Sequence, residues 1–166
     1  EEAGILRANF AGDPRVAVHA RDGYATLRAL LPPSVAGTRY ARGLVLIDPP
    51  YEAQLQEFDA ALAALRDGLG RWPQGSYALW FPIKQRRVLQ PFLRAAATLP
   101  AKSVLLAELL VRADDSPLRM NGSGMLLLNP PWQLDVQLAP TLDALRQALG
   151  EDGTAETRLA WLRAPA

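Results

Sequence analysis

The hydrophobic and polar positions of this chain follow two periods, one typical of strands and one typical of helices. Apolar runs or two-residue alternation predict strands at 15–20, 43–47, 76–81, 102–111, 124–128 and 154–162. Hydrophobic residues at three- and four-residue spacing predict helices over 3–10, 24–31, 52–69, 84–99 and 134–149. Because strands and helices alternate, we expect an α/β fold with a mainly parallel sheet and an antiparallel edge formed by the late strands.

Individual positions add detail to these elements. The helix predicted over 84–99 should turn Val88, Phe92 and Leu93 inward, and Pro91 within it predicts a kink or a later start. Prolines and a glycine between 32 and 37 predict a loop. The polar stretch 112–122 predicts a longer loop, of a size that suits a lid or a ligand contact.

Composition narrows the class of protein. With 166 residues, 49% hydrophobic and 21% charged, the chain suits one globular domain with a single core. It contains no Cys, and His19 is its one histidine, so we expect no disulfide, no cysteine nucleophile and no metal site. No apolar run approaches a membrane span, and residues 1–4 carry no basic segment of the kind that begins a leader peptide. We therefore expect a cytoplasmic protein without membrane contact.

Charge favours a nucleic-acid partner only weakly. The formal net charge is +1, which says little about partners by itself. Of the 18 basic residues, however, all but Lys84 and Lys102 are arginines. Arginine is the side chain suited to bidentate contacts with phosphates and bases.

The apolar run 43–47 ends in Asp48-Pro49-Pro50-Tyr51, the main candidate site. Ligands of open α/β sheets bind outside the carboxyl ends of strands, so we expect Asp48 to face a crevice. The prolines lack N–H donors, which leaves their carbonyls and the carboxylate as acceptors, and the Tyr51 ring can stack on a planar heterocycle. These groups suit an amino group on a ring, such as that of a nucleobase. The alternative is a plain turn in which Asp48 caps a helix and the prolines start it.

The residues around this motif resemble a known family. Asp48-Pro49-Pro50-Tyr51 is similar to the catalytic motif of S-adenosylmethionine-dependent amino-methyltransferases, in which Asp, Asn or Ser precedes Pro-Pro and an aromatic residue. More closely, the segments 42–52, 75–82 and 123–132 resemble, in order, the ribosomal RNA large subunit methyltransferase J family. That family methylates the exocyclic amine of one adenine in 23S ribosomal RNA. The similarity extends over nearly the whole chain.

The resemblance implies a Rossmann-like class I methyltransferase fold, S-adenosylmethionine as cofactor and 23S ribosomal RNA as partner. Ahead of the region that matches, family members carry a Gly-rich cofactor loop, an acidic residue for the ribose hydroxyls, a basic segment and an inserted helical subdomain. None has a counterpart in this sequence. We therefore expect residues 1–166 to be the C-terminal portion of one catalytic domain, lacking its first strands. We expect this portion alone to be inactive and to bind the cofactor weakly.

The resemblance also implies roles for individual residues. Asp48, Pro49, Pro50 and Tyr51 would be catalytic: the Asp48 carboxylate and the Pro49 carbonyl accept the two N–H groups of the adenine amine, and Tyr51 stacks on a base turned out of its helix. Asp22 and Gly23 match a pair that lies beside the cofactor adenine, and Asp48 borders the cofactor as well. Asp22 also has a simpler interpretation as the N-cap of the helix over 24–31, and the two roles are compatible.

A second stretch, Asn129-Pro130-Pro131-Trp132, matches the general amino-methyltransferase pattern and is a rival catalytic site. In the family the catalytic motif follows the Asp-Gly pair at a spacing close to that between Asp22 and Asp48. We therefore expect the Asn129 stretch to be a structural turn.

Basic and polar residues beyond the predicted strand 76–81 are candidates for RNA contact. Lys84, Arg86 and Arg87 cluster near a helix start and could hold phosphates, although a solvated helix face is equally consistent with three charges in four positions. Arg119 and Asn121, in the long loop, are weaker candidates of the same kind.

Two other functions stay open. The motif recognises an amine and not the polymer attached to it, so a methyltransferase acting on DNA adenine or on a protein glutamine is an alternative. A non-catalytic, methyltransferase-like fragment that binds nucleic acid or a partner is the other, favoured by the missing Gly-rich loop. The sequence does not predict the oligomeric state.

Overall fold

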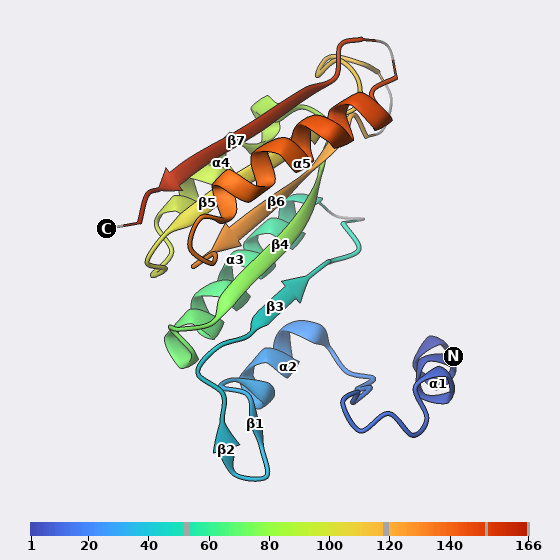
Figure 1. The fold of residues 1–166 in the computed structure, drawn as a ribbon, viewed down its shortest axis with the longest axis vertical. Helices are drawn as coiled ribbons and strands as arrows, with labels where there is room; N and C mark the ends of the chain where they lie inside the picture. The colour runs from blue at the N-terminus through green and yellow to red at the C-terminus, as the bar shows by residue number, and fades with distance from the viewer. Residues whose placement is uncertain (52–53, 118–119, 152, 166) are drawn as a thin grey trace.

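The computed structural model describes residues 1–51, 54–117, 120–151 and 153–165 (Figure 1). Its helices are α1 (Glu2–Asn9), α2 (Gly23–Leu30), α3 (Gln54–Arg71), α4 (Arg86–Ala97) and α5 (Leu134–Leu149). Its strands are β1 (Ser34–Val35), β2 (Thr38–Arg39), β3 (Leu44–Ile47), β4 (Ser76–Ile83), β5 (Val104–Leu110), β6 (Gly122–Leu128) and β7 (Glu156–Arg163). The α/β class and all five predicted helices are confirmed, with ends shifted by a few residues.

The main sheet has the strand order β3-β4-β6-β5-β7. β3 pairs with β4 in parallel, whereas β4 with β6, β6 with β5, and β5 with β7 all pair antiparallel. The expectation of a mainly parallel sheet is therefore wrong for the described strands, because β6 inserts antiparallel between β4 and β5. β3, β4 and β5 nevertheless run in one direction, so their carboxyl ends meet at the same end of the sheet.

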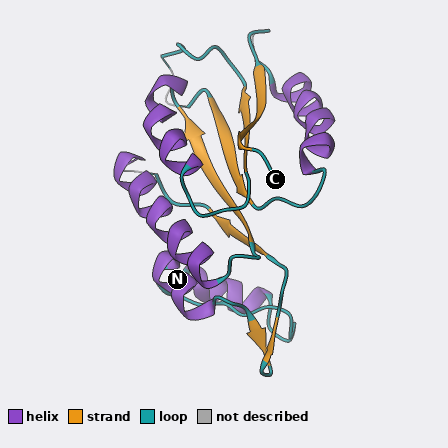
Figure 2. Ribbon diagram, turned by 90° about the vertical axis from the view of Figure 1, so that its left-hand side faces the viewer, coloured by secondary structure: helices purple, strands orange, loops and turns teal. Residues whose placement is uncertain are grey.

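Helices cover the two faces of the sheet unequally (Figure 2). α3 and α4 lie on one face, with α2 packed against α3, and α5 lies on the other face against β5 and β7. The larger core lies between the sheet and α3 and α4. It contains Phe58 of α3, Phe81 of β4 and Phe92 of α4, whose rings lie 4.3 to 6.4 Å apart between centroids.

The face of β3 that is turned away from α2 and α3 is covered by none of the described elements. Val45 is half-buried and Ile47 is buried toward the helices, while Leu44 and Leu46 are 66% and 64% exposed. β3 is also the edge of the sheet, since β4 is its one partner among the described strands. The strand alternation continues into Asp48, which is exposed like Leu44 and Leu46.

Three sequence-based expectations about the fold are wrong. Residues 15–20 form no strand, because a strand requires a partner for its backbone groups and this segment pairs with no described strand. The loop predicted at 32–37 is instead part of a small hairpin, β1 and β2, turned by Ala36 and Gly37 at positive φ. Val88 is 43% exposed, and α4 buries Leu89 in its place.

Among the described helices, none combines the length and the apolar composition needed to cross a bilayer.

Candidate functional site

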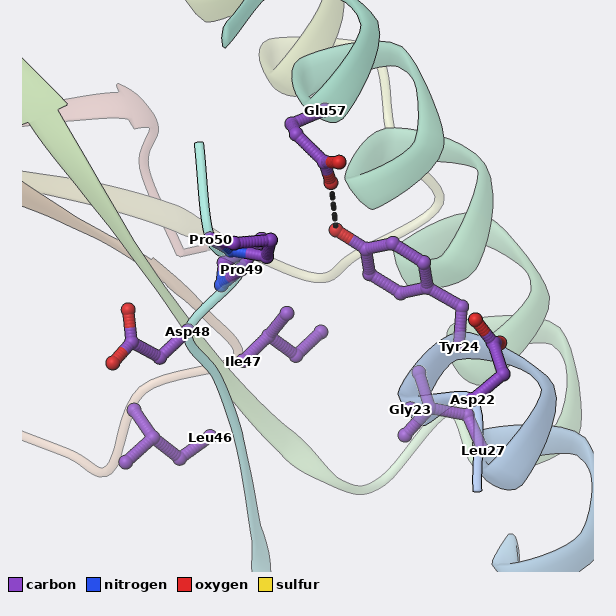
Figure 3. Close-up of a pocket in the computed structure, with 10 residues that line it drawn as sticks. All are labelled: Asp22, Gly23, Tyr24, Leu27, Leu46, Ile47, Asp48, Pro49, Pro50 and Glu57. Carbon is purple, nitrogen blue, oxygen red and sulfur yellow. Dashed lines mark hydrogen bonds between the residues drawn. The ribbon is translucent and has the colours of Figure 1, made fainter. Parts of the chain in front are cut away.

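A cavity of about 390 Å³ lies where β3 ends beside the first turn of α2 (Figure 3). α2 and the residue before it form one wall, the end of β3 forms another, and α3 contributes one side chain. The lining residues are Asp22, Gly23, Tyr24, Leu27, Leu46, Ile47, Asp48, Pro49, Pro50 and Glu57. The cavity therefore brings together two stretches that the sequence singled out separately, Asp22-Gly23 and the motif that begins at Asp48.

The strand geometry of β3 sets the direction of Asp48. Residues 46 and 48 project to the same side of a strand, and Asp48 accordingly shares the open side with Leu46. In Figure 3 its carboxylate points away from Tyr24 and Glu57, across the end of the strand. Asp48 is exposed, whereas Pro49 behind it is buried. No described residue forms a hydrogen bond or an ion pair with the Asp48 carboxylate, so its oxygens are open to a ligand.

Asp22 caps α2, as one of the two sequence interpretations predicted. Its Oδ1 accepts a hydrogen bond from the backbone N–H of Ala25 at 2.7 Å, and its backbone carbonyl accepts one from the Thr26 hydroxyl at 2.7 Å. The capping bond satisfies one of the free N–H groups of the first turn. The other carboxylate oxygen makes no bond with the described residues. The role of Asp22 and Gly23 toward a cofactor stays a prediction, compatible with the cap.

Tyr24 and Glu57 form a polar pair that sequence reasoning missed. The Tyr24 hydroxyl donates a hydrogen bond to Oε2 of Glu57 at 3.3 Å, which joins α2 to α3 across the cavity (Figure 3). Burial, together with the neighbouring Glu57 carboxylate, raises the pKa of Tyr24 to about 12, so the phenol stays protonated. The sequence signal was the adjacency of Tyr24 to the Asp22-Gly23 pair.

The charged side chains that line the cavity are all acidic. Among its lining residues, Asp22, Asp48 and Glu57 carry carboxylates and none is a Lys or Arg. Leu27, Ile47 and the prolines supply apolar surface between these acids. A flat ligand with amino groups or a positive charge matches this combination, because the walls favour a ring and the acids favour donors and cations.

Tyr51 does not face the cavity, which contradicts the stacking role expected for it. Its ring is 7% exposed and packs at 5.5 Å from the Phe58 ring and 5.8 Å from the Trp80 ring between centroids. Its hydroxyl donates a hydrogen bond to the backbone carbonyl of Trp80, and burial raises the pKa of the phenol. The backbone of Tyr51 adopts a φ of 51°, which turns the side chain from the cleft into the core.

The second motif is a structural turn in the described fold. The Asn129 side-chain amide donates to the carbonyls of Pro73 and Gly75, both at 3.1 Å, and its Oδ1 accepts from the backbone N–H of Lys102 at 2.7 Å. These bonds occupy both donors of the amide and its oxygen. The oxygen of Asn129, the group that would accept from a substrate amine, is therefore already bonded to the backbone of Lys102.

The candidate RNA contacts occupy different environments. Lys84 and Arg87 are exposed, and Arg87 donates to the Gln85 side chain at 2.9 Å. Arg86 is bound to Glu156 at 2.6 Å and lies 3.3 Å from the buried carboxylate of Glu108. Its guanidinium is thus engaged within the protein and is not a free phosphate donor.

Of the two loop candidates, the structure describes only Asn121, and that residue is not at the surface. Asn121 is fully buried, and its amide donates to the carbonyls of Lys84, Asp114 and Ser116, so RNA has no access to the side chain. Arg119 lies outside the described residues. Of the four candidates that the structure describes, Lys84 and Arg87 have exposed side chains.

Comparisons with known proteins add independent information. The family described as "Ribosomal RNA large subunit methyltransferase D, RlmJ" matches residues 1–163. Two curated relatives, both named ribosomal RNA large subunit methyltransferase J, are 35% identical in Haemophilus influenzae and 34% identical in Escherichia coli, over 95% of this chain and 54% of each relative. A crystal structure of a protein from Legionella pneumophila is similar, with a TM-score of 0.70 and 27% identity, over 84% of this chain and 49% of that one. The chain thus spans about half the length of the curated relatives it matches.

Proposed function

The chain belongs to the family described as ribosomal RNA large subunit methyltransferase D, RlmJ, and on that basis we propose that it serves in methyl transfer from S-adenosylmethionine to the exocyclic amine of an adenine in 23S ribosomal RNA. Because it spans 54% of its curated relatives, we assign the complete reaction to protein of the full family length. In this proposal the catalytic domain is Rossmann-like and of class I, and the reaction takes place in the cytoplasm, where ribosomal RNA is made and assembled.

One observation carries the proposal: an exposed Asp48 carboxylate, without a partner among the described residues, stands at the carboxyl end of β3, and Asp48 is one of the residues that line the cavity. An unpaired carboxylate beside a proline carbonyl presents acceptors and no donors. An amine with two N–H groups can donate one hydrogen bond to each of these two acceptors. Family membership supports ribosomal RNA as the molecule that carries the amine, and the choice of the adenine amine is part of the proposal.

The cavity residues suit the cofactor that a methyltransferase family implies. Asp22 has a carboxylate oxygen free for an amino group, Gly23 leaves room at the first turn of α2, and Leu27 and Ile47 offer apolar contact to a ring. The acidic lining favours a cationic ligand. When bound, S-adenosylmethionine supplies a methyl group carried on a positively charged sulfur atom.

Asp48 and Pro49 would act by aligning the amine. The Asp48 carboxylate accepts one N–H of the target amine and the Pro49 carbonyl accepts the other, which directs the nitrogen lone pair toward the methyl carbon. With the amine held by Asp48 and Pro49, S-adenosylmethionine, when bound, would supply the methyl group to the nitrogen and keep the electron pair of the broken carbon–sulfur bond on its sulfur. The nitrogen then releases its extra proton, late in the reaction, to the Asp48 carboxylate or to water. Pro50 holds the turn rigid, and Tyr51, being buried, anchors it instead of stacking on the base.

The test is methyl transfer by protein of the full family length with three acceptors. Fragments of 23S ribosomal RNA, DNA of the same sequence and a glutamine-containing peptide are each incubated with radiolabelled S-adenosylmethionine. The proposal expects label on adenine of the RNA and background on the other two. Label on DNA or peptide in preference to RNA would assign the motif to the alternative substrate class.

The non-catalytic alternative is tested on the cofactor. Calorimetric titration of S-adenosylmethionine into this chain and into protein of the full family length separates the two cases. We expect weak or no binding to the 166-residue chain and clear binding to the longer protein. Absence of binding to both, with retained RNA binding, would favour a nucleic-acid-binding role without turnover.

A further inference from the structure

A second concavity, of about 680 Å³, lies at the opposite end of the sheet from Asp48. Its lining residues precede β3, β4 and β5 or follow β6 and β7, so all of them lie at the amino end of the parallel strands. They are Ala41, Arg42, Pro73, Gln74, Lys102, Ser103, Asn129, Pro130 and Pro165. We call this concavity the basal groove. It is separate from the cavity that contains the proposed catalytic residues.

The charge of the basal groove is opposite to that of the catalytic cavity. Arg42 and Lys102 line it, and no lining residue is an Asp or Glu. Both cationic residues are exposed, and neither forms an ion pair with any described residue. Some other arginines, Arg28, Arg86, Arg112 and Arg158, each lie beside a carboxylate elsewhere in the fold. The basal groove therefore presents two unneutralised positive charges.

Asn129 makes the floor of the groove rigid by joining three loops. Its side chain bonds to Pro73, Gly75 and Lys102, its backbone N–H donates to the Ser103 carbonyl at 3.0 Å, and its own carbonyl accepts from the Ser76 hydroxyl at 2.8 Å. A preorganised surface loses little conformational entropy when a ligand binds. The Asn129-Pro130-Pro131-Trp132 stretch, which forms a structural turn, thus helps to form this groove.

We propose that the basal groove binds the phosphate backbone of the RNA substrate, with Arg42 and Lys102 as the contacting cations. The proposal rests on the RNA substrate class proposed above. Charge complementarity supports it, because an RNA strand is a polyanion and Arg and Lys supply most of its backbone contacts. Trp132, 84% exposed and two residues beyond Pro130, is available to stack on a base near the same groove.

The distance between the two sites gives the proposal a length dependence. Arg42 and Asp48 flank β3 and are separated by six residues along an extended chain, which is roughly 20 Å at about 3.3 Å per residue. An RNA whose target adenine sits at Asp48 must extend well past that base to reach Arg42. A short oligonucleotide cannot occupy both sites at once.

The test compares the double variant Arg42→Ala/Lys102→Ala with a matched control, Arg66→Ala/Arg94→Ala, which removes the same charge from two exposed helix positions. RNA binding is measured by fluorescence anisotropy at several salt concentrations, in protein of the full family length. We expect the first variant to lose about tenfold in affinity at low salt and to lower the salt slope by about one to two, while the control changes the slope little. Equal effects in the two variants, or none in the first, would overturn the proposal.

Methylation of short and long RNA separates this proposal from the proposed function. Arg42→Ala/Lys102→Ala should raise KM about tenfold for a long RNA and leave turnover of a short RNA around the target adenine unchanged. If the wild-type protein methylates neither RNA, the proposed function itself is wrong. If the wild type methylates both RNAs and the double variant matches it on both, the proposed role of the basal groove is wrong and the proposed function is unaffected.

Discussion

The hydroxyl of Tyr51 donates a hydrogen bond to the backbone carbonyl of Trp80, which ties the turn after β3 to the middle of β4. Tyr51 thus holds the turn in place from its buried side. Asp48 and Pro50 remain on the outside of that turn, where they are exposed. The bond fixes the turn, while the alternation of β3 directs Asp48 outward, so the motif has Asp48 and Pro50 exposed and Pro49 and Tyr51 buried.

Removal of the Tyr51 hydroxyl should lower the stability of the fold more than it lowers the rate of methyl transfer. Tyr51→Phe leaves the Trp80 carbonyl without its partner, and we expect it to lower the free energy of unfolding by about 1–2 kcal/mol. Tyr51→Ala also leaves a cavity beside Phe58, with an expected loss of about 3–5 kcal/mol. Chemical denaturation measures both. If Tyr51 instead acted as a base-stacking platform, Tyr51→Ala would leave stability unchanged and reduce only RNA turnover.

Asn129 should be a stability residue and not a catalytic one. Asn129→Ala removes three side-chain hydrogen bonds and puts alanine at a φ of 49°, so we expect the free energy of unfolding to fall by about 2–4 kcal/mol. Asn129→Gly is the matched control, because glycine tolerates that φ and should recover only the backbone share of the loss. Methyl transfer per folded molecule to a short RNA around the target adenine should stay near wild type, because such an RNA does not reach the basal groove. Abolished turnover in a well-folded Asn129→Ala variant would restore this motif as a catalytic site.

Glu108 should make stability depend on pH. Its carboxylate is fully buried, and burial raises its pKa even though Arg86 and Arg158 lie 3.3 and 3.8 Å away and act in the opposite direction. A raised pKa in the folded state means that the folded protein binds more protons than the unfolded chain above the ordinary value of 4.5. The contribution of Glu108 to stability is therefore fully present below that value and is lost as pH rises through the folded-state pKa.

The isosteric variant Glu108→Gln isolates this effect. We expect the free energy of unfolding of wild type, relative to that of Glu108→Gln, to fall as pH rises from about 4.5 toward neutrality. Glu156→Gln is the control, since it breaks the other ion pair of Arg86 at a carboxylate that is 61% exposed. Parallel pH profiles for wild type and Glu108→Gln would show that Glu108 titrates as it does in the unfolded chain.

Local patterns in the sequence predicted the elements that position the site, because those elements form from contiguous residues. The apolar run before Asp48 forms β3, and the hydrophobic spacing over 52–69 predicted α3, whose Phe58, Leu62 and Leu65 are buried. The N-cap role of Asp22 was also predictable, since capping depends on neighbours within one turn.

Relations between distant residues were not predictable in the same way. The insertion of β6 between β4 and β5 depends on strand pairing across the whole chain, and periodicity carries no information about partners. The burial of Tyr51 depends on a single positive φ and on Trp80, 29 residues away. The contact of Tyr24 with Glu57 spans 33 residues. The resemblance to a family implied an exposed ring at Tyr51, and the packing of this fold places it inside.

The proposed role of the Asp48 carboxylate in aligning the adenine amine is tested most directly by single-turnover methyl transfer with Asp48→Ala and Asp48→Asn in protein of the full family length. Asp48 is exposed and has no partner among the described residues, so unfolding should show little change in either variant. With both folded and still binding S-adenosylmethionine by calorimetry, we expect methyl transfer to 23S ribosomal RNA to fall by at least about 10²-fold, the scale of losing one preorganised contact in a transition state. Near-normal turnover in folded Asp48→Ala would contradict the account.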